Sequence, residues 1–474
     1  MMGLHQKQTE LWVEPVNLGR RIPEDHFLRK LNKALDLGFL REEVAGFYGR
    51  NGNVSVDPVV IMKMMLLLFL DNVKSERELV KIIPLRIDYL WYLGYGLEDA
   101  VPDHSVLSKA RARWGEEVFK RLFQVTVTKC LEAGLIDGSK LHMDSSLVRA
   151  NASKNSIVEK ACAEVLGKLD EAPAAQAGAH QGDDDNDKRP PNQRKQSTTD
   201  PDASMVRQGG GKSEPSYKNH RVVDDKEGVV TAVKTTTGMV NEAHELITLA
   251  RQHEENTGCN AQVVVADCKY GIAENFVELA SQKIRSHMGD FRARQNNPRQ
   301  KGIFEYARFK YDKVTDTYIC PARESLYRRH MDIRGNYEYI TRAGVCSQCR
   351  LREQCTRSRT GRTLKRHVDQ PLLDRARRQS HSKAAVLDRK RRQHFQERNF
   401  ADAANHHGFK RARWRGLVKQ SIQDLLIAGL QNLRLLARKA NILGAKSFLR
   451  RIATLIAEIL HTWLAARLVP AMTA

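Results

Sequence analysis

The chain has 474 residues, which is enough for two or three domains with sizeable cores. Lysine and arginine number 78 against 56 acidic residues, and the formal charge of +22 favours a polyanionic partner such as nucleic acid. No apolar signal-peptide core is seen at the start, and the most apolar segment, 59–70, contains Lys63 and is too short to cross a bilayer. We therefore expect no membrane contact, and the eight cysteines, which are unpatterned except near 320–355, suggest a reducing cytoplasm.

The first 135 residues are predicted to be helical from their apolar period and capping signals. Asp57-Pro58 is an N-cap followed by a first-turn proline, and it opens a helix that runs to residue 71. Residues 75–78 form a capping box for a second helix, and a third, basic helix follows Ser105. Such helices suit a helix-turn-helix DNA reader and an ordinary helical bundle equally well, and periodicity does not separate the two.

From residue 138 onward the pattern changes to strands and helices. The expected elements are a strand, a two-stranded hairpin, a helix, a short buried strand and a further helix, at 140–148, 218–223 with 229–236, 242–252, 262–266 and 273–283. This order predicts a mixed α/β sheet with helices packed on it.

Two interruptions divide this pattern. After a helix expected at about 156–169, residues from about 171 to 212 contain an acidic run, a Pro-Pro pair and three consecutive glycines, and we predict a disordered linker. The second interruption, 291–375, contains Cys320, Cys346, Cys349 and Cys355. A C-x-x-C pair with two further cysteines suits one structural Zn²⁺, and this reading is favoured over buried free thiols because the segment has few large apolar residues.

The final third is predicted to be helical and carries an arginine-rich turn. A basic stretch leads into a helix that contains Glu397, and amphipathic helices are expected at 425–436 and 448–464. Clustered cations with one tryptophan suit phosphate binding and base stacking; we expect DNA contacts from Arg398, Lys410, Arg411, Arg413 and Arg415.

Three carboxylates stand in settings typical of metal ligands. Asp144 lies within the first strand, Asp267 ends the 262–266 strand, and Glu397 lies in the basic helix. Two strand-borne aspartates and one helix-borne glutamate supply the oxygen ligands that a pair of Mg²⁺ ions needs for phosphoryl transfer. Three unrelated surface carboxylates are the less favoured reading, because both aspartates follow β-type apolar residues.

Taken in order, these motifs resemble those of the DDE transposases of bacterial insertion sequences, within the RNase H-like nucleotidyl transferases. The matching segments are Asp57-Pro58-Val59-Val60, Ser75 to Leu79, Pro102 to Ser105, Asp144-Ser145-Ser146, Ala150-Asn151-Ala152, Thr199 to Ala203, Ala266-Asp267, Tyr270-Gly271, Glu397, Phe400-Ala401, His407-Gly408 and Arg411 to Gly416. The likeness extends over almost the whole chain. It departs from the family pattern at Ala404, where lysine is usual, and at Arg398, where a small residue is usual.

The resemblance implies an RNase H-like mixed sheet with flanking helices, preceded by a helical DNA-binding domain and interrupted by the Cys-rich insertion. The expected divisions are 1–135 for the helical domain, 136–290 for the first part of the core, 291–375 for the insertion, 376–445 for the core helices and 446–474 for a C-terminal helix.

The implied activity is metal-dependent DNA cleavage and strand transfer at the ends of an insertion sequence. Asp144 would bridge two Mg²⁺ ions, or Mn²⁺ in their place, with Asp267 and Glu397 each completing one side. The implied partners are terminal inverted repeats and target DNA, bound by a homodimer. Two alternatives are a metal nuclease that cuts without joining and a regulatory DNA-binding derivative without catalysis; only the departures at Ala404 and Arg398 favour the second.

Overall fold

The computed structural model describes residues 17–49, 55–160, 191–207, 211, 213–289 and 302–439. Internal contacts divide the chain into two compact units. Unit 1 comprises Met1–Asn241, Thr248–Ala261 and His394–Ala474, and unit 2 comprises Glu242–Ile247 and Gln262–Gln393. The expected helix at 448–464 lies outside the described residues.

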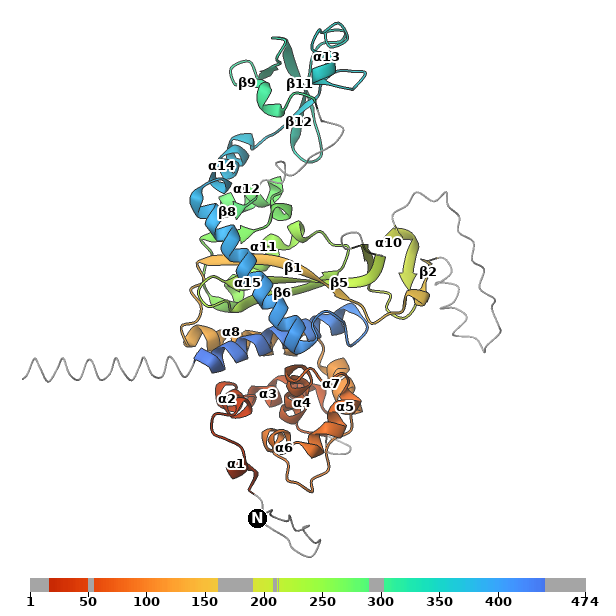
Figure 1. Cartoon of the computed structure of the whole chain (residues 1–474), viewed down its shortest axis with the longest axis vertical. Coiled ribbons are helices and arrows are strands. Elements are labelled where there is room, and N and C mark those ends of the chain that lie inside the picture. Colours follow the sequence, from red (N-terminus) through yellow and green to blue (C-terminus); the bar gives the residue numbers. More distant parts are fainter. Residues whose placement is uncertain are drawn as a thin grey trace, which may run out of the picture. The chain divides into compact units, whose positions relative to one another are not determined.

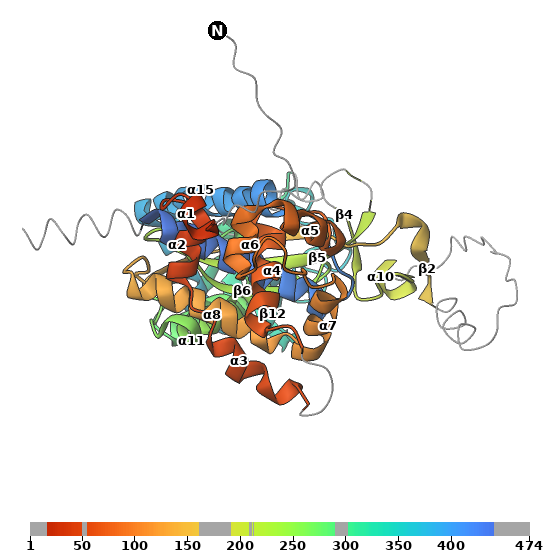
Figure 2. The ribbon, with the colours of Figure 1, turned by 90° about the horizontal axis from the view of Figure 1, so that it is seen from below.

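The N-terminal part of unit 1 is helical, as predicted (Figure 1). Its α-helices are α1 (Leu18–Arg21), α2 (Phe27–Ala34), α3 (Phe39–Val44), α4 (Pro58–Leu70), α5 (Glu76–Ile82), α6 (Ile87–Leu93), α7 (Ser105–Trp114) and α8 (Glu117–Glu132). Short 3₁₀ turns, Ala45–Phe47 and Ile83–Leu85, follow α3 and α5. Figure 2 shows α2, α4 and α6 gathered together, in agreement with the contacts of α6 with both other helices.

The predicted caps are confirmed where α4 and α5 begin. The Asp57 side chain accepts a hydrogen bond from the Val59 amide (2.9 Å), and the Ser75 hydroxyl accepts one from the Glu78 amide (3.1 Å). Helix α4 is buried almost all round; its one cation, Lys63, donates to the Tyr92 carbonyl (2.7 Å). A buried, capped helix of this kind serves as a core element, since burying its apolar surface is the main stabilising term.

Unit 1 also contains an antiparallel sheet built around the long strand β5 (Ser213–Asp224). Strand β1 (Lys140–Arg149) pairs along one edge, while β4 (Ser204–Arg207) and β6 (Val230–Thr237) pair with successive parts of β5. The predicted β5–β6 hairpin is therefore confirmed. One continuous apolar core joins α2–α8, this sheet and the helical residues 417–439.

Two predictions in the first interruption are wrong within the described residues. The expected helix at 156–169 starts as a 3₁₀ turn (Lys154–Ser156) and a strand, β2 (Ile157–Glu159), which pairs with β3 (Lys195–Ser197) because β-branched residues favour extended backbone. The predicted linker is too long, since α10 (Pro191–Arg194), β3 and β4 all fall inside it. Buried Asp200 stabilises this segment by accepting hydrogen bonds from the Tyr217 hydroxyl and the Gly416 amide.

Unit 2 contains two parallel strands, β7 (Val263–Ala266) and β8 (Arg285–Met288), with α12 (Ala273–Ser281) and α14 (Gln370–Ser380) packed beside β8. Two 3₁₀ turns, Glu242–Glu245 and Cys268–Tyr270, lie in the same unit. Helices α11 (Leu246–Thr257) and α15 (Lys383–His407) have residues in both units. The structure is thus mixed α/β, as predicted, and no helix of the described residues is long and apolar enough to cross a membrane.

The Cys-rich interruption folds as a five-stranded antiparallel sheet of order β13-β12-β11-β10-β9 (Figure 1). Its elements are β9 (Lys310–Asp312), β10 (Thr317–Ile319), β11 (Ser325–Met331), β12 (Asn336–Ile340) and β13 (Leu364–His367), with a 3₁₀ turn at Tyr306–Arg308 and a short helix α13 (Arg352–Cys355). Five side chains form a small core of its own: Phe309, Tyr318, Leu326, Tyr339 and Leu364. Such a small core supplies little hydrophobic stabilisation, so this sheet needs a further source of stability.

Candidate active site

Asp144 is held on strand β1 between buried neighbours. Leu141 and Met143 are fully buried, whereas Asp144 is half-buried and accepts a hydrogen bond from the Ser145 amide (2.8 Å). In the antiparallel register, Asp144 lies directly opposite Arg221 of β5. The strand therefore fixes the backbone of this carboxylate while leaving the side chain partly open to solvent.

Glu397 is exposed on helix α15, and residues on either side of it tie that helix to the sheet of unit 1. Gln396 donates to the carbonyl of His142 on β1 (2.7 Å), and the Phe395 ring stacks on the His142 ring at 5.4 Å. Arg221 donates to the Asn399 side chain (2.8 Å). His142 lies two positions from Asp144, Arg221 is the residue opposite Asp144 on β5, and the contact residues of α15 lie within two positions of Glu397. Strands β1 and β5 and helix α15 therefore hold the two carboxylates on linked elements.

Arg221 is the centre of this connection and is completely buried. It also donates to Asn219 (2.7 Å) and Gln431 (2.7 Å), and its guanidinium lies over the rings of Phe400 and Phe409. Burial lowers the pKa of Arg221 to about 10, which leaves it charged at neutral pH.

Asp424 provides an opposite charge near Arg221. Burial raises the pKa of Asp424 to about 6, against the opposing effect of hydrogen bonds from Thr235 (2.6 Å) and Gln420 (2.9 Å) and of the Arg221 charge. A buried network of this kind is costly to disrupt, because each removed member leaves a partner unsatisfied.

Asp267 belongs to unit 2, at the end of fully buried β7. Its side chain is half-buried and caps the following 3₁₀ turn by accepting a hydrogen bond from the Lys269 amide (2.9 Å). Two of the three predicted ligands are thus carried by linked elements of unit 1, and the third lies in unit 2. Within the described residues, no three His, Cys, Asp or Glu side chains form a group arranged to hold a metal ion.

The predicted DNA-contacting cations differ in how they are placed. Lys410 donates to the hydroxyl of Ser146 on β1 (2.7 Å), and burial, with the Arg221 charge, lowers the pKa of Lys410. Arg411 is exposed and forms a backbone bridge to Arg149, and exposed Arg415 donates to the Asn151 carbonyl (3.2 Å). These three cations follow β1 from Ser146 to its C-terminal end.

The remaining two cations lie elsewhere in unit 1. Arg398 is exposed on α15, beside Asn399 and Asp402 in a shallow hollow. Arg413 instead directs its guanidinium into the protein, donating to the carbonyls of Leu68 (3.0 Å) and Val73 and to the Asn72 side chain (2.8 Å). Arg413 therefore connects the end of α4 to the arginine-rich turn, and we assign it a structural role rather than a DNA contact.

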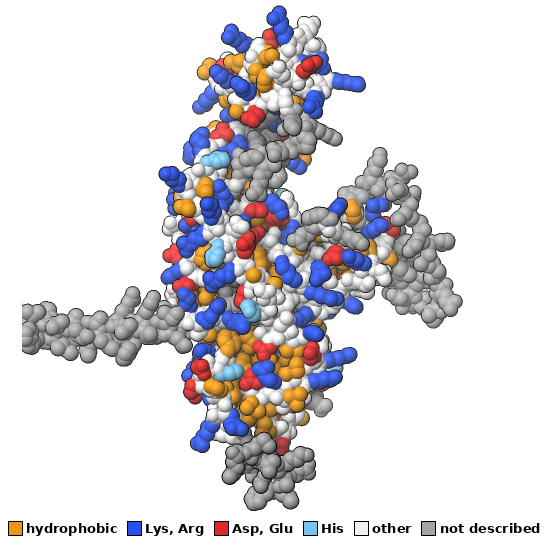
Figure 3. All heavy atoms as spheres, viewed as in Figure 1, with side chains coloured by type: hydrophobic (Ala, Val, Ile, Leu, Met, Phe, Trp, Pro, Cys, Tyr) orange, Lys and Arg blue, Asp and Glu red, His pale blue; other side chains and the backbone are white. Residues whose placement is uncertain are grey.

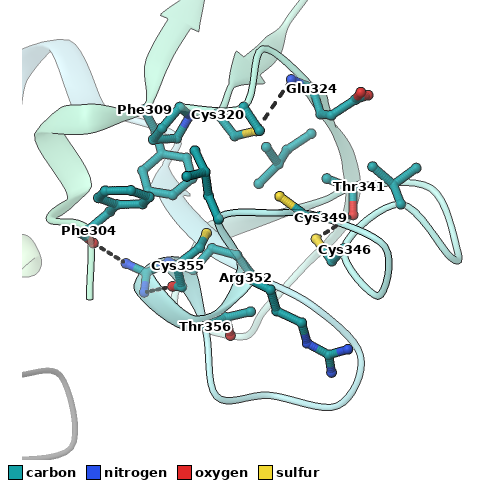
Figure 4. A pocket seen from close by; sticks show the side chains of 16 residues that line it. Phe304, Phe309, Cys320, Glu324, Thr341, Cys346, Cys349, Arg352, Cys355 and Thr356 are labelled. Carbon is teal, nitrogen blue, oxygen red and sulfur yellow. Dashed lines mark hydrogen bonds between the residues drawn. The ribbon is translucent and has the colours of Figure 1, made fainter. Parts of the chain in front are cut away.

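The four cysteines of the five-stranded sheet line one hollow (Figure 4), which we call the cysteine hollow. Burial raises the pKa of the Cys355 thiol, Arg362 lowers it, and the three other cysteines raise it further. The Cys320 sulfur accepts a hydrogen bond from the Glu324 amide (3.3 Å), and Cys346 contacts the Thr341 hydroxyl (3.1 Å). The thiols are therefore neighbours, although they do not converge as a finished metal site.

Sequence reasoning missed the residues that connect the two carboxylates of unit 1. Arg221 lies inside a predicted strand and is followed by two valines, and a charge next to such apolar residues was the available signal of a buried partner. Gln396, Asn399 and Gln431 gave no local signal, because their partners are distant in the sequence.

Two family models match the chain. Residues 16–113 match a transposase domain (DUF772), and residues 319–437, which include Glu397, match a transposase DDE domain. Both matches are to transposase domains, and together they support a DDE-type transposase. Asp144 and Asp267 lie outside both matched segments.

Comparison with solved structures finds transposase complexes. The matches include the Mos1 transposase paired-end complex with left transposon end, at 10% identity, and the Mos1 strand transfer complex, at 12%. Both have a TM-score of 0.16 and cover 52% of this chain and 64% of the Mos1 chain, so this chain spans less than two thirds of their length. At that TM-score the likeness carries no weight, and the assignment rests on the family models. No curated protein matches the sequence.

Proposed function

We propose that this transposase cuts DNA at the ends of an insertion sequence and joins them to target DNA. Asp144, Asp267 and Glu397 are the proposed metal-binding carboxylates, on an RNase H-like core. The observation that carries the proposal is the linkage of β1 to α15, because Gln396 and Arg221 anchor the helix of Glu397 to the strands at Asp144.

The donor chemistry fits magnesium, since all three groups are hard carboxylate oxygens. Bound Mg²⁺, or Mn²⁺ in its place, would activate the attacking oxygen and stabilise the leaving 3′-oxygen of a phosphodiester. The protein's own contribution is preorganisation. Asp144 lies on a paired strand and Glu397 on an anchored helix, so the backbone of both carboxylates is already in place before a metal ion binds.

Cations beside β1 supply the proposed DNA contacts. Residues two apart on a strand point to the same face, so Ser146, which accepts from Lys410, lies on the face of Asp144. The Lys410 ammonium is therefore near enough to Asp144 to pair with a phosphate oxygen there. Arg411 and Arg415 extend this basic surface beyond the strand end, and Arg398 lies one residue from Glu397. Terminal inverted repeats and target DNA, bound by a homodimer, are the proposed partners.

Substitution of the carboxylates tests the proposal. Asp144→Asn, Asp267→Asn and Glu397→Gln should each abolish cleavage of linear DNA carrying the element's ends, while DNA binding stays within a few-fold, because an amide keeps the shape and loses the ligand charge. The matched control is Glu254→Gln, an exposed helical glutamate of unit 1. Full cleavage by any one site variant would remove that residue from the site.

Products in the same assay separate the rival functions. Cleavage with joined product indicates a transposase reaction, and cleavage without joining indicates a nuclease. A gel shift with neither product, in Mg²⁺ or Mn²⁺, indicates a regulatory DNA-binding protein and would overturn the proposal.

We also propose one structural Zn²⁺ held by Cys320, Cys346, Cys349 and Cys355. Its support is a shared hollow lined by four thiols, the C-x-x-C spacing and the small core of the surrounding sheet. Protein purified without added zinc should contain about one equivalent, and Cys346→Ser with Cys349→Ser should lose it. A zinc-free protein, or zinc retained by the double variant, would contradict this proposal in favour of free thiols.

A further inference from the structure

The segment between β12 and β13, residues 342–362, has a strongly one-sided charge. It contains six arginines and a single acidic residue, Glu353. We call it the arginine loop. Three of its cysteines, Cys346, Cys349 and Cys355, line the cysteine hollow. The segment thus has an excess of positive charge, and its cysteines place it against the hollow.

The backbone of the arginine loop is fixed by contacts within unit 2. The Arg352 amide donates to the Cys349 carbonyl (3.1 Å), and the Phe304 amide donates to the Gln354 carbonyl (2.7 Å). Gly361 has φ +106°, and a Cβ there would lie 2.9 Å from the Cys346 sulfur, so no side chain fits. The loop is therefore held in one shape rather than being a free tether.

Five of the six arginines divide into an inward and an outward group. Arg362 donates to the carbonyls of Cys355 (3.2 Å) and Phe304 (3.3 Å), and so belongs to the fold. Arg342, Arg350 and Arg359 are exposed, and Figure 4 shows half-buried Arg352 directed away from the cysteines. The Arg342 guanidinium lies over the exposed Tyr327 ring, 5.2 Å from its centroid.

Three of the outward arginines lack the ion pairs that neutralise cations on the strands. In the same sheet Arg328 pairs with Asp316 (2.9 Å), and Lys365 pairs with Asp332 (2.9 Å). No carboxylate of the described residues lies within ion-pair distance of Arg342, Arg350 or Arg359. Figure 3 shows Lys and Arg side chains spread over this sheet, with few acidic ones between them.

We infer that the arginine loop is a second DNA-binding surface, separate from the cations beside β1, which grips the phosphate backbone. Unneutralised guanidinium groups on a backbone that is held in place offer phosphate oxygens both positive charge and hydrogen-bond donors. The loop itself contains no aromatic residue, so it offers no platform for stacking bases. Contacts of this kind position a duplex without reading its sequence. The inference rests on the proposed DNA-processing function.

The test compares two triple variants of the full chain. Arg342→Gln/Arg350→Gln/Arg359→Gln removes the outward charges of the loop. Lys310→Gln/Lys313→Gln/Arg329→Gln removes the same number of exposed charges from the same sheet outside the loop. Binding of a fluorescent DNA duplex is measured by anisotropy over a series of KCl concentrations, in EDTA so that no cleavage occurs.

Each phosphate contact contributes roughly 0.9 to the slope of log K against log salt. We expect the loop variant to lose between about 1 and 3 from that slope, equally on end-containing and random duplexes. The control variant should keep the slope, and both should unfold at the wild-type temperature. An unchanged slope in the loop variant, or an equal loss in the control, would overturn the inference. Because the assay needs no catalysis, its outcome is independent of whether Asp144, Asp267 and Glu397 prove catalytic.

Discussion

Replacing Arg221 with methionine should destabilise the protein severely. The substitution keeps an unbranched side chain, although a shorter one, and removes the charge, every donor and the guanidinium that lies over Phe400 and Phe409. Three acceptors, on Asn219, Asn399 and Gln431, lose a partner at 2.7–2.8 Å. Asn219 and Gln431 are buried, so water does not replace their lost donor, whereas Asn399 is half-buried.

The magnitude follows from two opposing effects. Burying a guanidinium is costly, and the lowered pKa of Arg221 reflects that cost, which methionine would avoid. Against this, hydrogen bonds to a charged group contribute about 1.5–3 kcal/mol each, and fully buried Asp424 would lose its compensating charge. Breaking one side of a buried network has cost about 3–5 kcal/mol, so we expect a loss of that size in the free energy of unfolding.

Urea unfolding followed by circular dichroism measures the loss. Exposed Arg438→Met is the matched control, for which we expect a change below about 0.5 kcal/mol. A double-mutant cycle of Arg221→Met with Asn399→Ala should give a coupling energy of about 1–3 kcal/mol. A cost below about 1 kcal/mol for Arg221→Met, or no coupling to Asn399, would refute the view that Arg221 ties the Asp144 strand to the Glu397 helix.

Three further outcomes are expected. Burial lowers the pKa of His407 to about 4, whereas the unfolded chain takes up this proton near pH 6.5. The free energy of unfolding should therefore fall as the pH drops from 6.5 towards 4. In urea titrations, His407→Gln should remove about 2 kcal/mol of that loss at pH 5. Lys410→Gln should weaken both DNA binding and cleavage, whereas Ala404→Lys should be neutral because Lys410 already lies beside β1; a large gain from Ala404→Lys would show that nothing compensates for the missing lysine. Gly361→Ala should lower the zinc content measured by metal analysis, because the new methyl group meets the Cys346 sulfur; a full equivalent of zinc in that variant would contradict the packing described for the arginine loop.

Much of the local structure follows from short-range rules in the sequence. Asp57-Pro58 and Ser75 start helices where their caps predict, because a side-chain cap and the amide that it binds are only two or three residues apart. The strand of Asp144 and the β5–β6 hairpin were predictable from runs of apolar residues and a polar turn. The order of these motifs also indicated the transposase family, which the two family models bear out.

The tertiary structure decided which polar residues are buried and which residues are their hydrogen-bond partners. Arg221 meets Asn399 and Gln431 across 178 and 210 positions of sequence, a separation that no local pattern encodes. Arg413 belongs to a basic cluster like its neighbours, yet packing against the end of α4 turns it inward. Residues 191–207 look like a linker by composition, and they are ordered because Asp200 finds Tyr217 and Gly416 in the folded chain. A charged side chain can be buried only where distant segments supply its partners, so composition alone could not distinguish these residues from exposed ones.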